Sequence, residues 1–273
     1  MRARHCGPLS WLAWHLLAFL FPRAATQATQ ATLPALPAIV EVDLIYPRNE
    51  TYAPPAHMPV VFAIQNSAFA ATLDPIFYLQ LWRVDLNYSV AFDFEIRTVT
   101  ANFSSSDPYF VYFGTNTLNH TEGLWALQWQ VLLRNCSRQG LGPLVQGREH
   151  NDFVMFTTKN GAPQPDLVAA AAGNACDGRK GFAVNVTDLM IPFIEPKNED
   201  GSQDGRNASC AILSPMPAPE PQPCRVKMGA AAASSITAAI SATPCVRCHS
   251  GAGHLRSDRV GFAAAFPLMY FLI

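Results

Sequence analysis

The feature that most constrains this fold is a strict alternation of apolar and polar residues in several short segments. Ile39–Tyr46, Val90–Arg97 and Leu124–Arg134 place aliphatic or aromatic residues at every second position, with charged or amide residues between them. Successive side chains of a strand point to opposite faces, so this period predicts half-buried antiparallel strands. Less regular candidates for strands are Pro59–Ile64, Ile76–Val84, Tyr109–Phe113, Asp152–Thr158 and Phe182–Val186.

About eight short strands separated by turn-rich segments predict a mainly β protein. We expect an antiparallel β-sandwich, immunoglobulin-like or jelly-roll, over residues 39–194. Residues 195–223 are polar and then rich in proline, which predicts a loop with an extended strut. Residues 224–248 form a segment flanked by cysteines, and its Ala-rich part, Gly229–Ala242, lacks proline and predicts a C-terminal helix.

The first residues are typical of a signal peptide. Arg2 and Arg4 precede the apolar run Trp11–Phe21, which is too short to cross a bilayer, and small residues follow it. We therefore expect a signal peptide over residues 1–25 and a Thr/Ala/Gln-rich leader over residues 26–38. The predicted route is export through the secretory pathway.

The last residues, 249–273, follow the order of a signal for attachment of a GPI lipid. Small residues, with Ser250 and Gly251 as candidate attachment sites, precede a polar spacer and the uncharged tail Val260–Ile273. Fourteen helical residues would extend about 21 Å, short of the ~30 Å hydrocarbon core. We therefore expect a membrane-anchored protein on the outer cell face or in the cell wall, with a short transmembrane tail as the alternative.

The cysteines indicate an extracellular protein. Without Cys6 of the signal peptide, an even number remains, which predicts a disulfide framework: Cys136, Cys176, Cys210, Cys224, Cys245 and Cys248. We expect a Cys136–Cys176 bridge in the β domain and the other four cysteines in the C-terminal segment.

The net charge argues against a nucleic-acid partner. Removing both processed ends leaves 14 basic and 19 acidic residues, a net charge of −5.

Sequons for N-glycosylation are strongly enriched. With 13 asparagines and 30 serines and threonines in 273 residues, chance would give about 1.4 sequons, and the chain has seven. The candidate sites are Asn49, Asn87, Asn102, Asn119, Asn135, Asn185 and Asn207. Four of them, from Asn49 to Asn119, fall in predicted turns, where a bulky glycan is tolerated. Use of Asn135 is expected to be poor because Cys136 follows it.

No arrangement of residues predicts chemistry, so we expect no catalytic residue, metal or cofactor. Cys245-Val-Arg-Cys248-His249 matches the short string used to attach c-type haem, but disulfide cysteines are the favoured interpretation. Asp93 and Glu95 share one strand face about 7 Å apart, a spacing that a glycosidase could use. Alternating charge on a solvated strand is the favoured explanation, and a secreted carbohydrate-active enzyme remains the alternative to a binding protein.

The aromatic residues suggest where a ligand could bind. Trp125 and Trp129 lie on the apolar side of a predicted strand and are expected in the core. Tyr52 and Tyr109, in predicted turns, are the candidate contact residues. The expected function is non-catalytic binding of a cell-wall glycan or a surface protein.

Four stretches of the chain resemble an uncharacterised family of fungal secreted proteins, known only as a domain of unknown function. They are Glu41–Pro54, Phe156–Val168, Cys210–Pro215 and Cys224–Ile236. The resemblance reaches from about residue 38 to residue 248, nearly the whole mature chain. It implies a fungal source and an extracellular glycoprotein, and it supplies no activity and no catalytic residues.

Overall fold

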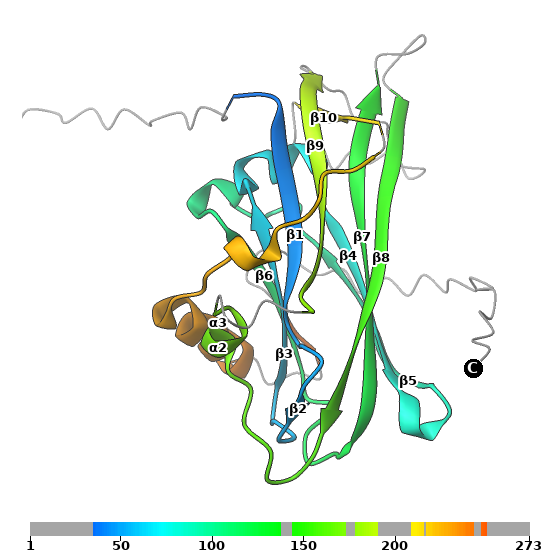
Figure 1. Cartoon of the computed structure of the whole chain (residues 1–273), viewed down its shortest axis with the longest axis vertical. Helices are drawn as coiled ribbons and strands as arrows, with labels where there is room; N and C mark the ends of the chain where they lie inside the picture. The colour runs from blue at the N-terminus through cyan, green and yellow to red at the C-terminus, as the bar shows by residue number, and fades with distance from the viewer. Residues whose placement is uncertain are drawn as a thin grey trace, which may run out of the picture. The chain divides into compact units, whose positions relative to one another are not determined.

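A computed structural model describes residues 35–137, 144–172, 178–190, 209–215, 217–242 and 247–249. Its strands form two sheets that pack together, as the alternating segments predict, and Figure 1 shows their arrangement. The first sheet, called sheet A, has the strand order β10-β9-β1-β3-β6-β11. The second, called sheet B, has the order β2-β8-β7-β4-β5.

All neighbouring strands of sheet A are antiparallel. Its strands are β1 (Ala38–Tyr46), β3 (Met58–Gln65), β6 (Tyr109–Thr115), β9 (Lys180–Met190), β10 (Cys210–Leu213) and β11 (Arg247–His249). Sheet B is also antiparallel, except for the short parallel pair β2–β8. Its strands are β2 (Thr51–Tyr52), β4 (Ile76–Arg83), β5 (Ser89–Arg97), β7 (Gly123–Ser137) and β8 (Leu144–Thr158).

Short helical segments connect or cover the strands. The longest among the described residues is α3 (Ala230–Ala242), the helix that the Ala-rich sequence predicts. The others are η1 (Ser67–Phe69), α1 (Ala70–Leu73), η2 (Val84–Leu86), η3 (Phe103–Ser105), α2 (Leu167–Ala170) and η5 (Pro223–Arg225).

Large aromatic side chains fill the space between the sheets. Trp125 and Trp129 of β7 are buried, as predicted, and Trp129 packs against Phe62 of β3 with 5.4 Å between ring centroids. Phe62 also lies 4.9 Å from the ring of Phe77 on β4. These contacts join the two sheets through side chains that point inward from β3, β4 and β7.

The outer faces of the two sheets differ in their exposure. Along β7 buried and half-buried residues alternate, whereas β1 is buried continuously from Val40 to Tyr46. Helices α2 and α3 and the segment around η5 contact sheet A, and Figure 1 shows α2 and α3 beside β3 and β6, away from β7 and β8. Among the described residues, helices and connecting segments therefore cover the outer face of sheet A, and none covers the outer face of sheet B.

We call α2, α3 and the segment around η5 the covering layer. Its position changes the interpretation of β1. The alternation predicts that Glu41 and Asp43 point to solvent, but they are only 4% and 0% exposed. The backbone N–H of Gln222 donates a hydrogen bond to Glu41 Oε1, so the segment after β10 lies over them. The strand was correctly predicted, but its polar face is buried because residues far along the chain cover it.

Cys136 and Cys210 form a disulfide, as two of the predicted disulfide cysteines, but the predicted pairing of Cys136 with Cys176 was wrong. Cys136 of β7 bonds to Cys210 of β10 with an S–S distance of 2.00 Å, and so links sheet B to the edge of sheet A. The expected partner, Cys176, lies outside the described residues. Strand β10 falls in the segment expected to be a loop. Its four residues are too few to show the apolar–polar alternation that predicts a strand. Cys224 is also disulfide-bonded.

Candidate functional site

The outward side chains of sheet B form a continuous surface, which we call the open face. They lie at the half-buried and exposed positions of β4, β5, β7 and β8, opposite the positions that fill the core. The aromatic, amide and carboxylate residues of the open face are Tyr78, Gln80, Trp82, Asp93, Glu95, Gln128, Gln130, Glu149, Asn151 and Phe153. Arg97, Ala126, Leu132 and Arg134 occupy further outward positions of the same sheet. Aromatic, amide and carboxylate groups are thus mixed on one side of a sheet.

The strand register places these groups in rows across the sheet. Gln80 pairs with both Gln128 and Asp93, and Gln128 pairs with Phe153. Directly paired residues of antiparallel strands share a face, with β-carbons about 5 Å apart. Their side chains therefore form one row that crosses all four long strands of the sheet.

A second row lies beside the first. Tyr78 pairs with Glu95 and Gln130, and Gln130 pairs with Asn151. Gln128 Nε2 donates a hydrogen bond of 3.2 Å to Asn151 Oδ1, so the two rows are connected. Each side-chain amide carries two N–H donors and an oxygen with two lone pairs, so the bonded amides retain capacity for a ligand.

The aromatic residues supply apolar surface among these polar groups. Phe153 is 51% exposed, although phenylalanine is usually buried in folded proteins. Tyr78 and Trp82 are half-buried on the same face of β4, about 13 Å apart along the strand. Three aromatic rings separated by amides resemble a platform on which sugar rings can stack and form hydrogen bonds.

The charges of the open face are mainly negative. Glu95 forms an ion pair with Arg97, and Glu149 Oε2 accepts a hydrogen bond of 3.1 Å from Gln130 Nε2. Burial raises the pKa of Tyr78, and the carboxylates of Glu95 and Glu149 raise it further. The phenol of Tyr78 thus stays protonated at neutral pH and can donate a hydrogen bond.

The tyrosines predicted to contact a ligand lie elsewhere. The prediction for Tyr52 was wrong: it lies in β2, is only 4% exposed, and its hydroxyl accepts a 3.0 Å hydrogen bond from the backbone N–H of Arg48. Tyr109 begins β6, half-buried against Phe103 with 5.0 Å between ring centroids. Neither belongs to the open face. They were predicted because they lie near turns, whereas the aromatic residues of the open face lie at outward positions of strands.

The predicted sequons fall into two groups. Asn49, Asn87, Asn102 and Asn119 are exposed and lie outside strands. Asn135 and Asn185 are half-buried within β7 and β9, and Asn135 Oδ1 accepts a hydrogen bond of 2.9 Å from the backbone N–H of Leu213. Asn207 lies outside the described residues. The exposed group offers room for a glycan, and the side chain of Asn135 is already engaged.

Two pairs of carboxylates lie on strands. Asp93 is exposed and Glu95 half-buried on the open face. Glu41 and Asp43 are buried in β1, where burial, and then Glu41, raise the pKa of Asp43 to about 8. A hydrogen bond from Gln65 and the charge of Arg179 oppose that shift. The buried pair lies beneath the covering layer, where it contributes to the core.

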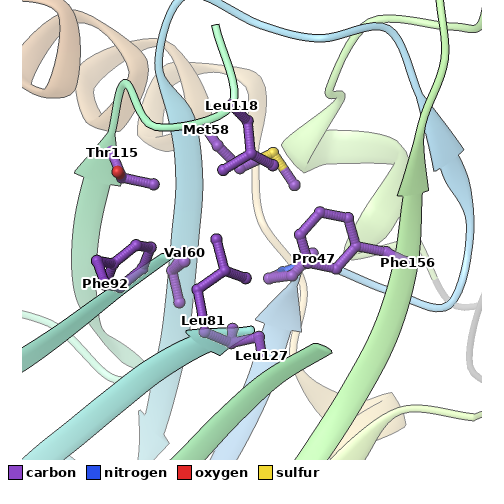
Figure 2. Close-up of a pocket in the computed structure, with 9 residues that line it drawn as sticks. All are labelled: Pro47, Met58, Val60, Leu81, Phe92, Thr115, Leu118, Leu127 and Phe156. Carbon is purple, nitrogen blue, oxygen red and sulfur yellow. The ribbon is translucent and has the colours of Figure 1, made fainter. Parts of the chain in front are cut away.

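Figure 2 shows a small pocket between the sheets. It is lined almost wholly by apolar side chains: Pro47, Met58, Val60, Leu81, Phe92, Thr115, Leu118, Leu127 and Phe156. The cavity volume is about 10 Å³, close to the minimum for one water molecule. This pocket is a packing gap in the core, too small for an organic ligand.

The remaining predicted sites lie at or beyond the limits of the described residues. Cys248 and His249 belong to β11, which pairs with β6, whereas Cys245, Ser250 and Gly251 are not described. The described residues contain no group of three or more His, Cys, Asp or Glu side chains that could hold a metal ion. In the same part of the chain, no helix is both long and apolar enough to cross a membrane.

The described residues thus form a two-sheet β protein. Other segments cover the outer face of sheet A, and the outer face of sheet B carries the open face. The chain belongs to the family described as Domain of unknown function (DUF7136), whose model matches residues 35–252. Comparison with curated proteins and with solved structures gives no significant match.

Proposed function

We propose that this protein is a secreted, N-glycosylated surface protein that binds a neutral polysaccharide of the cell wall on its open face. The observation that carries the proposal is the exposure of aromatic and amide side chains on sheet B, while other parts of the chain cover sheet A. Carbohydrates stack their C–H faces on aromatic rings and exchange hydrogen bonds with amides and carboxylates. Tyr78, Trp82 and Phe153 would provide the stacking, and Gln80, Gln128 and Gln130 the hydrogen bonds.

The charge of the open face narrows the class of ligand. Arg97 pairs with Glu95 and Arg134 pairs with Asp74, so Asp93 and Glu149 leave the open face negative. Like charges facing each other across an interface are unfavourable, so an anionic polysaccharide would be repelled. A neutral glucan or chitin avoids this cost.

The cellular setting rests on the sequence. The signal-like start, the seven sequons and the GPI-like tail support display on the outer face of the membrane or in the wall. The Cys136–Cys210 disulfide supports folding in an oxidising compartment. Release of the protein from intact cells by a phosphatidylinositol-specific phospholipase tests the anchor.

The binding test compares retention of the purified protein on insoluble β-glucan, chitin and cellulose. Trp82→Ala and Phe153→Ser are expected to weaken binding roughly tenfold each, as loss of a buried aromatic contact does. Val168→Ser is the matched control, because Val168 is 39% exposed on α2, away from sheet B. Equal retention of all variants, or retention of none of the proteins including wild type, contradicts the proposal.

A further inference from the structure

The hairpin that joins β4 to β5 ends in an unusual turn. Asn87 and Tyr88 both adopt left-handed backbone conformations, with φ of 54° and 55°. Two such residues in succession are typical of tight hairpin turns, in which glycine usually takes the second position. A bulky aromatic residue with positive φ is a conformational outlier, so Tyr88 is not the residue that the turn itself favours.

The same hairpin exposes an unusual amount of apolar surface. Leu86, Tyr88 and Val90 are 58%, 61% and 51% exposed, and they lie within five positions of the chain. The other large apolar side chains exposed in the described residues are dispersed: Ile39, Phe153 and Val168. We call Leu86, Tyr88 and Val90 the hairpin patch. Backbone strain and exposed apolar surface thus coincide in this hairpin.

A suitable cover can be attached within the patch itself. Asn87-Tyr88-Ser89 is a sequon, and Asn87 is exposed at the tip between Leu86 and Tyr88. From the geometry we infer that the N-glycan on Asn87 folds back so that its first N-acetylglucosamine residues pack on the hairpin patch. The inference rests on the glycosylation that is part of the proposed function.

The chemistry of attachment fixes the position of the sugar. Asn87 Nδ2 bonds to the anomeric carbon of an oligosaccharide carried on a lipid pyrophosphate. The carbon–oxygen bond to the pyrophosphate breaks, the leaving group takes the electron pair, and the amide loses one proton. The first sugar ring is then tethered beside Tyr88, at a high effective concentration, so a weak contact with the ring is sufficient.

A second sequon offers a contrast. Asn49 is also exposed, but its neighbours are Arg48 and Glu50, which form an ion pair with 3.3 Å between Arg48 Nε and Glu50 Oε1. Polar neighbours give a sugar no apolar surface to cover. A glycan on Asn49 is therefore the matched control, because it adds the same mass and polarity without the hairpin patch.

The experiment uses the full chain expressed in a glycosylating host, with the occupancy of each sequon measured by mass spectrometry. Thermal unfolding is compared for wild type, Ser89→Ala, which removes the sequon and keeps Asn87 in the turn, Tyr88→Gly, and the variant that carries both changes, with Leu86→Ser as a second partner. We expect Ser89→Ala to lower the unfolding midpoint by a few degrees in wild type and to have no effect in the Tyr88→Gly background. Asn49→Gln should change the midpoint equally in both backgrounds.

A local measurement tests the contact directly. Nuclear Overhauser effects between the N-acetyl group of the first sugar and the Tyr88 ring are expected in the glycosylated protein. An occupied Asn87 without such effects, or with the same midpoint change in both backgrounds, overturns the inference. An empty Asn87 beside occupied sequons overturns it while leaving the proposed function intact, and empty sequons throughout overturn both.

Discussion

Gly114 of β6 lies directly beneath Ile240 of α3, so close that a β-carbon at position 114 would overlap the Cγ2 atom of Ile240. The helix therefore packs against the sheet at a point where only glycine leaves enough room. We expect Gly114→Ala to destabilise the protein by about 1–3 kcal/mol, the usual cost of overpacking a core. Urea unfolding measures this change. Gly229→Ser, at a position with open space around it, should be close to neutral.

The disulfide between Cys136 and Cys210 closes a long loop, since 74 residues separate the two cysteines. Replacing both by alanine frees that loop in the unfolded chain. Chain-entropy arguments give a loss of about 4 kcal/mol in the free energy of unfolding. Chemical unfolding of the double variant, beside wild type with its disulfides intact, checks the value. A loss below about 1 kcal/mol would contradict the loop-closure argument.

Arg179 connects the covering layer to the sheet. Its guanidinium donates hydrogen bonds to the carbonyl oxygens of Ala170, Ala172 and Pro223, at 2.7, 3.0 and 2.8 Å. A lysine ammonium cannot reach three carbonyls spread around a planar fork. Arg179→Lys should therefore cost about 2–4 kcal/mol, measured by urea unfolding. Arg97→Lys, at an exposed arginine, should cost less than about 0.5 kcal/mol.

The buried Asp43 should make stability depend on pH. Its pKa rises from 3.8 to about 8, chiefly through burial and the neighbouring Glu41, so the folded protein keeps a proton that the unfolded chain releases. Stability should therefore fall as pH rises from about 4 to about 8, by at most about 1.4 kcal/mol per pH unit. Urea midpoints measured from pH 4.5 to 8.5 provide the test.

Asp43→Asn isolates this effect. The variant cannot release the proton, so its stability should not show the decline caused by Asp43. His150, whose pKa is lowered by burial, titrates in both proteins and cancels in the difference between the two profiles. Parallel profiles for wild type and variant would contradict the assignment.

The long strands could be predicted from sequence because their apolar pattern is local, whereas the short strands β2, β10 and β11 were not predicted. Every predicted strand lies within an observed strand to within one residue, as Ile76–Val84 does in β4, which ends at Arg83. The helix α3 was predicted equally well from its alanines. Both signals come from neighbouring residues and need no knowledge of tertiary structure.

The covering layer and the open face could not be predicted in this way. Glu41 and Gln130 alternate with apolar neighbours in the same manner, yet one is buried and the other half-exposed. The difference arises because the covering layer packs over sheet A and not over sheet B. Period-two patterns show that a face is polar, but they do not show whether another part of the chain covers it.

The covering layer also determines when the protein can finish folding. Glu41 and its partner Gln222 are 181 residues apart, so β1 emerges from the ribosome long before the segment that covers it. Until that segment has been synthesised, the face of β1 that carries Glu41 and Asp43 lacks the cover that it has in the folded protein. A chain terminated shortly after β9 would keep that face open to solvent, so we expect it to be less stable than the full chain.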